Sequence, residues 1–247
     1  MLRQFTRKPV ASTLAVLLVC AAAVPSAAQD RRAGSNQLAA GSALTAPTTP
    51  EAIEAAKANS QAPGLRLPFP PLDKMEPAMR DEFIRGGRGF YTPVGPRAAL
   101  LFTPKVAAAM NTMLPALQTS EMKSDLFELT ILMVAREWDS QFEWWVHEPQ
   151  GIKAGLPAAA VNAIRVDRTP KFADPKQAAA YQYLKELLRD RKVSDATYAR
   201  LTNLIGTQQL VEMNVLTGYY ITVAINLVAH NVPLRADVKP PLPPRRK

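Results

Sequence analysis

The chain has 247 residues, of which 47% are hydrophobic and 21% are charged, and its formal net charge is +9. This length supports one sizeable hydrophobic core, and a single cysteine excludes a disulfide framework. The basic residues are not interleaved with aromatic ones as in a nucleic-acid-binding protein, so we expect no nucleic-acid partner.

Residues 1–28 have the pattern of a secretory signal peptide. Basic residues precede the apolar run 10–24, and small residues follow at 26–28, where a signal peptidase would cut. Cleavage after Ala28 would remove three basic residues and the only cysteine, Cys20, and would lower the net charge from +9 to +6. We therefore expect an exported protein, periplasmic or secreted. A lipoprotein anchored at Cys20 is the less favoured alternative, because Val19 is a poor match just before a lipid-modified cysteine.

Composition divides the rest of the chain into three parts. Residues 29–72 are rich in Ala, Ser, Thr and Pro and have little apolar surface to bury, so we expect a disordered leader. Residues 73–236 are expected to form one helical domain. Residues 237–247 form a proline-rich basic tail, which we expect to be extended and suited to anionic surfaces.

Helix-start signals recur through the domain, and no Asn-Gly or Asp-Gly hairpin turn separates them. The short connections favour an all-α fold, a compact array of seven or eight helices. Proline in the first turn, as at Pro104 and Pro175, supports two of the starts. The predicted helices span residues 104–117, 121–136, a segment opening at 139–140, and then 157–164, 176–189, 195–204 and 207–228.

The last predicted helix is the most apolar. Residues 213–230 are mostly apolar, but Asn214, Thr217, Thr222 and Asn226 interrupt them. These polar interruptions favour a buried core helix over the alternative of a membrane span. We therefore expect no transmembrane segment after signal cleavage.

Glu128 lies in an apolar stretch, Leu126-Phe127-Glu128-Leu129-Thr130-Ile131-Leu132-Met133-Val134-Ala135. A helix that is apolar on all faces is buried on all faces, so Glu128 is predicted to be a buried carboxylate. A buried charge needs a partner or takes up a proton. The candidate cationic partners are His147, Arg136 and Arg97.

The next helix opens with the stretch Asp139-Ser140-Gln141-Phe142-Glu143-Trp144-Trp145-Val146-His147. Ser140, Glu143, Trp144 and His147 share one helical face. A short connection to the helix of Glu128 would bring the two carboxylates and the imidazole together, which would move their pKa values apart and suit acid-base catalysis. The alternative is structural: Ser140 and Glu143 have the spacing of a capping box, and the aromatic residues would fill the core.

Other readings of the polar residues are weaker. His230 ends the last helix, where a histidine complements the helix dipole. Glu128, Glu143, His147 and His230 have no recognised metal-ligand spacing, so we expect no metal. The sequence has no glycine-rich phosphate loop and no nucleophile elbow, and we expect no cofactor.

The stretch FELTILMVAREWDSQFEWWVHEPQGIKAGLPAAAVNAIR, followed by VSDATYARLTNLIG and VLTGYYITVAINLVAHNVPL, resembles the carboxymuconolactone decarboxylase / alkylhydroperoxidase D-like superfamily. Upstream, GPRAALLFTPKVAAAMNTM is similar to the helices that precede these motifs. The resemblance covers about residues 67–234 and several motifs in order. It implies an all-helical fold, assembly into homodimers, trimers or hexamers, and a pocket between helices close to a subunit interface.

The resemblance also implies roles for single residues. Peroxide-reducing members have two cysteines, a following histidine and an upstream glutamate. Here Ser140 and Glu143 stand at the cysteine positions, His147 at the histidine and Glu128 at the glutamate. Thiol-based antioxidant chemistry, although a general label of the family, is disfavoured because a serine and a glutamate cannot form a disulfide.

The leading hypothesis is therefore a lyase that performs decarboxylation or isomerisation on a small organic acid or lactone. His147, Glu128 and Glu143 are the predicted catalytic residues. Substrate contacts are expected from Trp144, Ser140 and Arg97, the last of them gripping a carboxylate. The alternative is a non-catalytic periplasmic binding or assembly module of the same fold.

Overall fold

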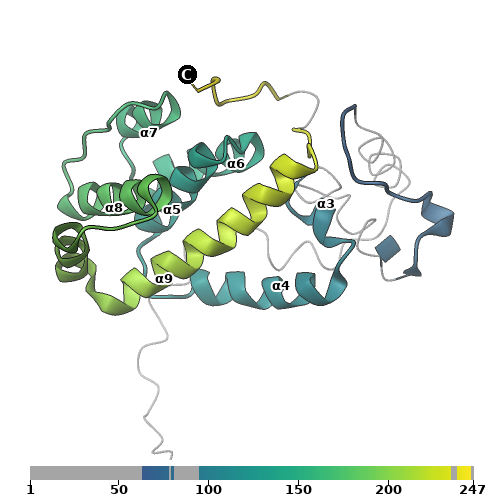
Figure 1. The fold of residues 1–247 in the computed structure, drawn as a ribbon, viewed down its shortest axis with the longest axis horizontal. Coiled ribbons are helices and arrows are strands. Elements are labelled where there is room, and N and C mark those ends of the chain that lie inside the picture. Colours follow the sequence, from purple (N-terminus) through teal and green to yellow (C-terminus); the bar gives the residue numbers. More distant parts are fainter. Residues whose placement is uncertain (1–62, 78, 81–94, 235–237, 246–247) are drawn as a thin grey trace, which may run out of the picture. The chain divides into compact units, whose positions relative to one another are not determined.

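The structure, a computed structural model, describes residues 63–77, 79–80, 95–234 and 238–245, without the side chains of Leu72 and Arg97 (Figure 1). The predicted signal peptide, most of the predicted leader and residues 235–237 and 246–247 lie outside this part. The described residues form helices and no strand, which confirms the all-α prediction.

Seven α-helices and two short helical turns make up this part of the chain. The elements are the 3-10 turn η1 (Leu72–Lys74), α3 (Arg97–Leu100), α4 (Pro104–Gln118), α5 (Ser124–Glu137), α6 (Gln141–Ala154), α7 (Ala158–Arg165), α8 (Pro175–Lys185), the π-helical turn η2 (Glu186–Asp190) and α9 (Asp195–Ala229).

Most predicted helix ends agree with the structure to within a few residues, but two differ. α5 begins at Ser124 rather than Glu121, because a bend precedes it in which the Ser120 hydroxyl accepts from the Met122 amide at 3.3 Å. The helix predicted over 176–189 ends as the π-helical turn η2. There the Glu186 carboxylate accepts hydrogen bonds from the start of the next helix at Ser194 and Thr197.

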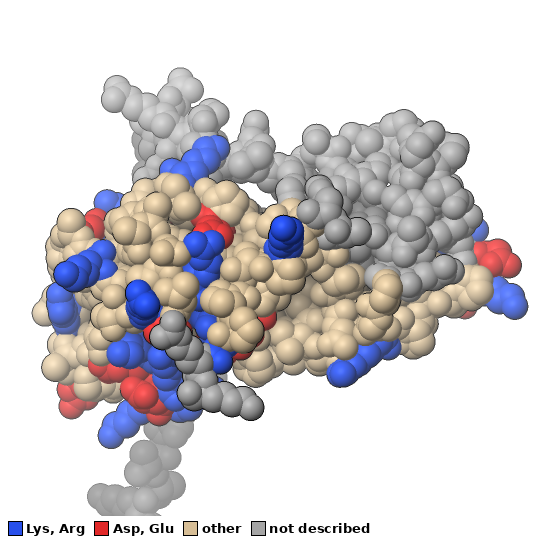
Figure 2. Space-filling view, turned by 90° about the horizontal axis from the view of Figure 1, so that it is seen from above, with Lys and Arg blue, Asp and Glu red and all other residues tan. Residues whose placement is uncertain are grey.

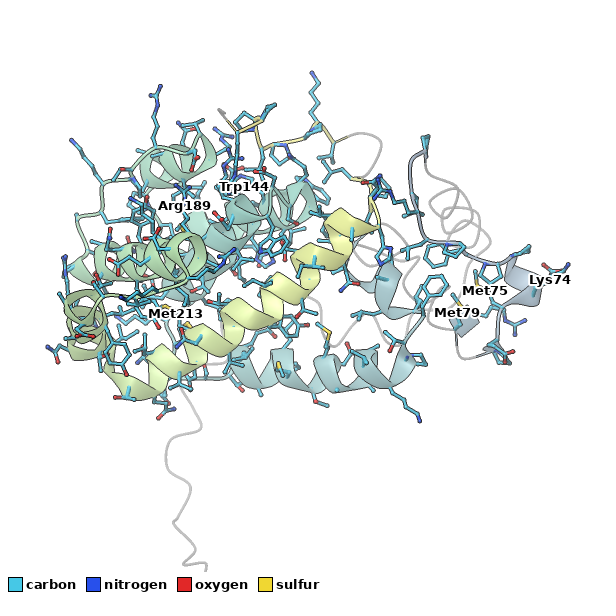
Figure 3. The ribbon with its side chains drawn as sticks, viewed as in Figure 1. Lys74, Met75, Met79, Trp144, Arg189 and Met213 are labelled. Carbon is cyan, nitrogen blue, oxygen red and sulfur yellow. The ribbon has the colours of Figure 1, made fainter. Side chains whose placement is uncertain are left out.

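α5 is the central helix, because it packs against α6, α7, α8 and α9. All its residues from Leu126 to Arg136 are buried, as the all-round apolar pattern predicts. Around it lie fully buried large side chains, including Leu184 of α8 and, labelled in Figure 3, Trp144 of α6 and Met213 of α9. This core fixes the surface between α5 and α6 on which the candidate site is built.

α9 has a break in the place where the sequence predicts one. Gly206 adopts φ 81° and ψ 162°, which is not helical, between the segments predicted at 195–204 and 207–228. The helix buries one face against α5 and α8 but exposes Val211, Val215 and Ile225. By length and composition alone α9 could cross a membrane, a test that the core helix of a soluble protein also passes.

The two ends of the described chain also pack on the helices. Although the disordered leader was predicted to reach residue 72, Leu67 is buried beside Ala98 and Ala99, and the Arg66 amide donates to the His230 carbonyl at 2.9 Å. Residues 66 and 67 of the predicted leader therefore contact the helices. At the other end, Leu242 of the predicted tail is buried in the main core.

Candidate active site

The structure brings together Glu128 of α5 and His147 of α6. Nδ1 of His147 lies 2.8 Å from Oε2 of Glu128, which is hydrogen-bond distance. Both side chains are largely buried, with 13% of His147 and 11% of Glu128 exposed. Of the three cationic partners that the sequence offers for Glu128, His147 is paired with it in the structure.

A glycine explains how closely the two helices approach at this point. Gly151 lies one helical turn after His147, and a Cβ atom built there would be 3.0 Å from Leu156 Cδ1 and 3.1 Å from Leu132 Cδ1. The same Cβ would touch Glu128 Cβ at 3.5 Å. A larger residue at this position would require the Leu132 and Leu156 side chains to shift, so Gly151 contributes to the close packing of α6 on α5 beside the carboxylate and the imidazole.

The hydrogen bond also determines which imidazole nitrogen is available. An ionised Glu128 carboxylate can only accept, so Nδ1 of His147 carries the hydrogen. In the neutral ring Nε2 is then the unprotonated nitrogen, which can accept a proton. Tyr220 of α9 packs edge-on against the ring, with centroids 5.2 Å apart and planes at 89°. This arrangement orients the ring as the carboxylate of a catalytic triad does.

Glu143 lies one helical turn before His147 and is almost completely buried, with 2% of the residue exposed. Neither of its carboxyl oxygens forms a hydrogen bond of regular geometry with another described residue. Burial raises the pKa of Glu143 from 4.5 to about 8, although the neighbouring Ser140 hydroxyl opposes the rise. Glu143 is therefore mostly a neutral carboxylic acid at neutral pH.

The predicted capping box is wrong. Ser140 is at the N-cap position of α6, but its side chain makes no cap hydrogen bond, and its buried hydroxyl has no partner of regular geometry among the described residues. The backbone of Ser140 forms hydrogen bonds instead: its amide donates to the Ala135 carbonyl at 2.8 Å, and its carbonyl accepts from the Trp144 amide at 3.1 Å. Ser140 and Glu143 are thus two adjoining buried polar groups whose side chains have no hydrogen bond of regular geometry to a described residue.

Trp144 has a structural environment. It is fully buried in the main core, and its indole Nε1 donates to Glu148 Oε2 at 2.9 Å (Figure 3). A side chain without exposed surface has no face to offer a substrate, so the structure places Trp144 in the packing of α6. The predicted role of Arg97 in gripping a carboxylate lies outside the described residues, because the side chain of Arg97 is not described.

His230 was considered both for a role at the end of a helix and as a possible metal ligand. His230 is at the C-cap of α9, the position expected for complementing the helix dipole. Among the described side chains, no group of three or more His, Cys, Asp or Glu residues is arranged to hold a metal ion.

The arrangement can transfer protons. It combines an imidazole, which an ionised Glu128 would hold in one tautomer, with a neutral carboxylic acid on the same helix. Tyr220 was not among the predicted site residues, because nothing in its local sequence distinguishes it from the other residues of an apolar helix. In comparisons with known proteins, the chain matches no family model and no curated protein.

Proposed function

We propose that this protein is an acid-base enzyme, of the carboxymuconolactone decarboxylase type, that acts on a small organic acid or lactone. The observation that carries the proposal is the 2.8 Å contact between Glu128 and His147, which leaves Nε2 of the imidazole as the reactive nitrogen. The sequence resemblance supports the same chemistry, because it places a glutamate and a histidine at these two positions.

In the proposed reaction His147 is the proton carrier and Glu128 is its orienting partner. A β-keto or β,γ-unsaturated acid loses carbon dioxide when the bond to its carboxylate breaks, and the electron pair left behind takes up a proton. His147 in its protonated form supplies that proton through Nε2. Glu128 stabilises the protonated ring by a charge-assisted hydrogen bond.

Glu143 has a supporting part in this proposal. The neutral form of Glu143 adds no negative charge beside an anionic substrate. An ionised Glu143 would add a second negative charge to that of Glu128. Thiol-based peroxide reduction is not proposed, because Ser140 and Glu143 occupy the positions of the two cysteines. We further propose that the protein is exported and acts as a homo-oligomer, as the signal pattern and the resemblance suggest.

A second candidate is a non-catalytic binding or assembly module of the same fold. The complete burial of Trp144, on the helix that carries His147, favours it. A module would need the helix for packing and would not need a reactive imidazole.

The test starts with a panel of small organic acids and lactones, screened by thermal shift against the wild-type protein and then by mass spectrometry for loss of carbon dioxide or isomerisation. For a compound that is converted, His147→Gln should lower kcat by at least about 100-fold, because a general acid contributes about 10²–10⁴-fold. His230→Gln, the same change at the only other histidine, is the matched control and should keep the activity.

Full activity of His147→Gln on such a compound would overturn the proposed mechanism. Binding of a compound without conversion, equal in the wild type and in His147→Gln, would support the binding module instead. The hydrogen bond itself can be tested without a substrate by NMR of the imidazole nitrogens. The neutral His147 ring should carry its hydrogen on Nδ1, and Glu128→Gln should weaken that preference.

A further inference from the structure

The end of the described chain, residues 238–245 (here the tail segment), lies against the turn that joins α5 to α6. This turn, residues 136–141, is called the α5–α6 corner. The tail segment has the sequence Val-Lys-Pro-Pro-Leu-Pro-Pro-Arg and no regular secondary structure. Its contacts with the corner and the core are of three kinds, made by the backbone, by an apolar side chain and by a charged side chain. Each kind recognises a different property of the segment.

The backbone contact is centred on Leu242. Its amide donates to Oε1 of Gln141 at 2.9 Å, and its carbonyl accepts from Nε2 of Gln141 at 3.1 Å. Proline has no N–H group, so within residues 240–244 only Leu242 has a backbone donor. The side-chain amide of Gln141 therefore pairs with the N–H and the C=O of Leu242, which is the one residue in this run that has both groups.

The apolar contact is made by the Leu242 side chain. Leu242 is 4% exposed and belongs to the main core cluster, together with residues of α5, α6, α8 and α9. A proline-rich segment is stiff and largely extended before it binds, so it loses less conformational entropy on docking than a flexible segment. The prolines beside Leu242 thus favour a defined extended geometry.

The charged contact is made by Arg245. Its guanidinium lies 3.1 Å from Oε2 of Glu137 and 3.4 Å from Oδ1 of Asp139, and it also donates to the carbonyl of Arg136. That carbonyl is at the C-terminal end of α5, where a cation also complements the helix dipole. Arg136 in turn donates to the carbonyl of Pro243 at 3.1 Å.

Arg245 also acts on a wider charged cluster. Asp167 forms a salt bridge with Arg189 of η2, and Arg189 also lies 3.6 Å from Glu137. Arg189 is labelled in Figure 3. Partial burial alone would raise the pKa of Asp167, but the hydrogen bond and charge of Arg189, with smaller effects of Arg245 and Arg136, lower it. Basic and acidic side chains also lie side by side at the left of the face in Figure 2.

We propose that the α5–α6 corner is a recognition site for an extended Leu-Pro-Pro-Arg segment, which the tail segment of the same chain occupies. Gln141 binds the backbone, the main core cluster accommodates the leucine side chain, and Glu137 with Asp139 binds the arginine. Gln141 is also the first residue of α6, between Ser140 and Glu143, so occupancy of the site orders the first turn of the helix that carries His147. The site does not depend on the proposed catalytic chemistry.

The test uses the full chain and a fluorescein-labelled peptide with the sequence of residues 238–245. The wild-type protein should bind the peptide weakly, because its own tail segment competes at a high effective concentration. In a full-length variant with Leu242→Ala and Arg245→Ala, the tail segment lacks the two side chains that the site binds and no longer competes. This variant should bind the labelled peptide at least about 10-fold more tightly by fluorescence anisotropy. Adding Gln141→Ala should remove this gain, whereas Gln208→Ala, an exposed glutamine on α9, should not.

Equal binding of the peptide by the wild type and the double variant would overturn the proposal, and so would a gain that Gln141→Ala does not affect. Hydrogen exchange gives a second measurement on the protein itself, which applies even if the double variant does not fold. In the wild type the Leu242 amide should be protected, and Gln141→Ala should remove that protection. If the segment instead docks on a second copy, dilution to the monomer will abolish protection of Leu242, which would overturn the intramolecular form of the proposal.

Discussion

Replacement of Glu143 by glutamine should change how the stability of the protein depends on pH. Glu143 is buried, its pKa is raised to about 8 from an ordinary value of 4.5, and glutamine has nearly the same shape without an ionisable group. The folded protein retains a proton on Glu143 that the unfolded chain releases above pH 4.5. Unfolding therefore releases a proton and becomes easier as the pH rises from 4.5 towards 8.

The size of the effect follows from the two pKa values. Each pH unit between them weakens the wild type by about 1.4 kcal/mol, so its free energy of unfolding should fall by about 2.5 kcal/mol between about pH 5 and about pH 7 through this group alone. Glu143→Gln buries an unsatisfied amide at a cost of about 1–3 kcal/mol at every pH. The variant should thus be no more stable than the wild type at about pH 5 and clearly gain on it at higher pH.

The assay is urea unfolding at several pH values, followed by tryptophan fluorescence and analysed by linear extrapolation. The quantity of interest is the difference in free energy of unfolding between the variant and the wild type, because other titrating groups cancel in it. Glu121→Gln makes the same chemical change at an exposed carboxylate and is the control. A difference between Glu143→Gln and wild type that stays constant with pH would refute the idea that Glu143 is neutral in the folded protein.

Two backbone predictions concern glycines. Gly206→Ala should lower the free energy of unfolding by about 1–3 kcal/mol in the same urea assay, since φ 81° and ψ 162° are accessible essentially to glycine alone; no loss would mean that the break in α9 is not fixed. Gly151→Ala should cost about 1–3 kcal/mol by overpacking against Leu132 and Leu156 and should disturb the tautomer of His147 in NMR spectra. An unchanged His147 spectrum would show that Gly151 does not set the distance between α5 and α6.

Features encoded by local patterns could be predicted from the sequence. The largely apolar stretch from Leu126 to Ala135 predicted a helix buried on all sides, and α5 is such a helix. A short connection to α6 and a polar residue in that stretch were enough to name His147 as one of three candidate partners for Glu128, and the structure pairs the two. A boundary between two helices was predicted from the helix-start signal at Thr207, and the non-helical Gly206 lies next to it.

One local pattern was misleading because two arrangements share its spacing. Ser140 and Glu143 are three residues apart, as in a capping box, and residues with this spacing also lie on one helical face. In a solvent-exposed helix start the caps would form. Here the first turn of α6 is buried, and its carboxyl group is neutral instead of accepting the cap hydrogen bonds.

Features that depend on contacts distant in the sequence could not be predicted. Tyr220 reaches His147 only because α9 crosses the helical domain, and the sequence near Tyr220 has no mark of that contact. The tail segment was predicted to be extended, but its docking depends on Gln141, which is 101 residues away from Leu242. Composition alone describes such a segment as polar and proline-rich and does not identify the one leucine that is buried.

The buried leucine of the tail segment changes where this domain should be cut for expression. The last helix ends at Ala229, and a boundary drawn there, or at residue 236 by composition, would leave a cavity in the core. Loss of a buried leucine side chain costs about 2–5 kcal/mol, enough to turn a folded domain into an insoluble fragment. Truncations for crystallisation should keep residues up to Arg245, and an affinity tag should be added after Lys247 rather than replace the residues before it.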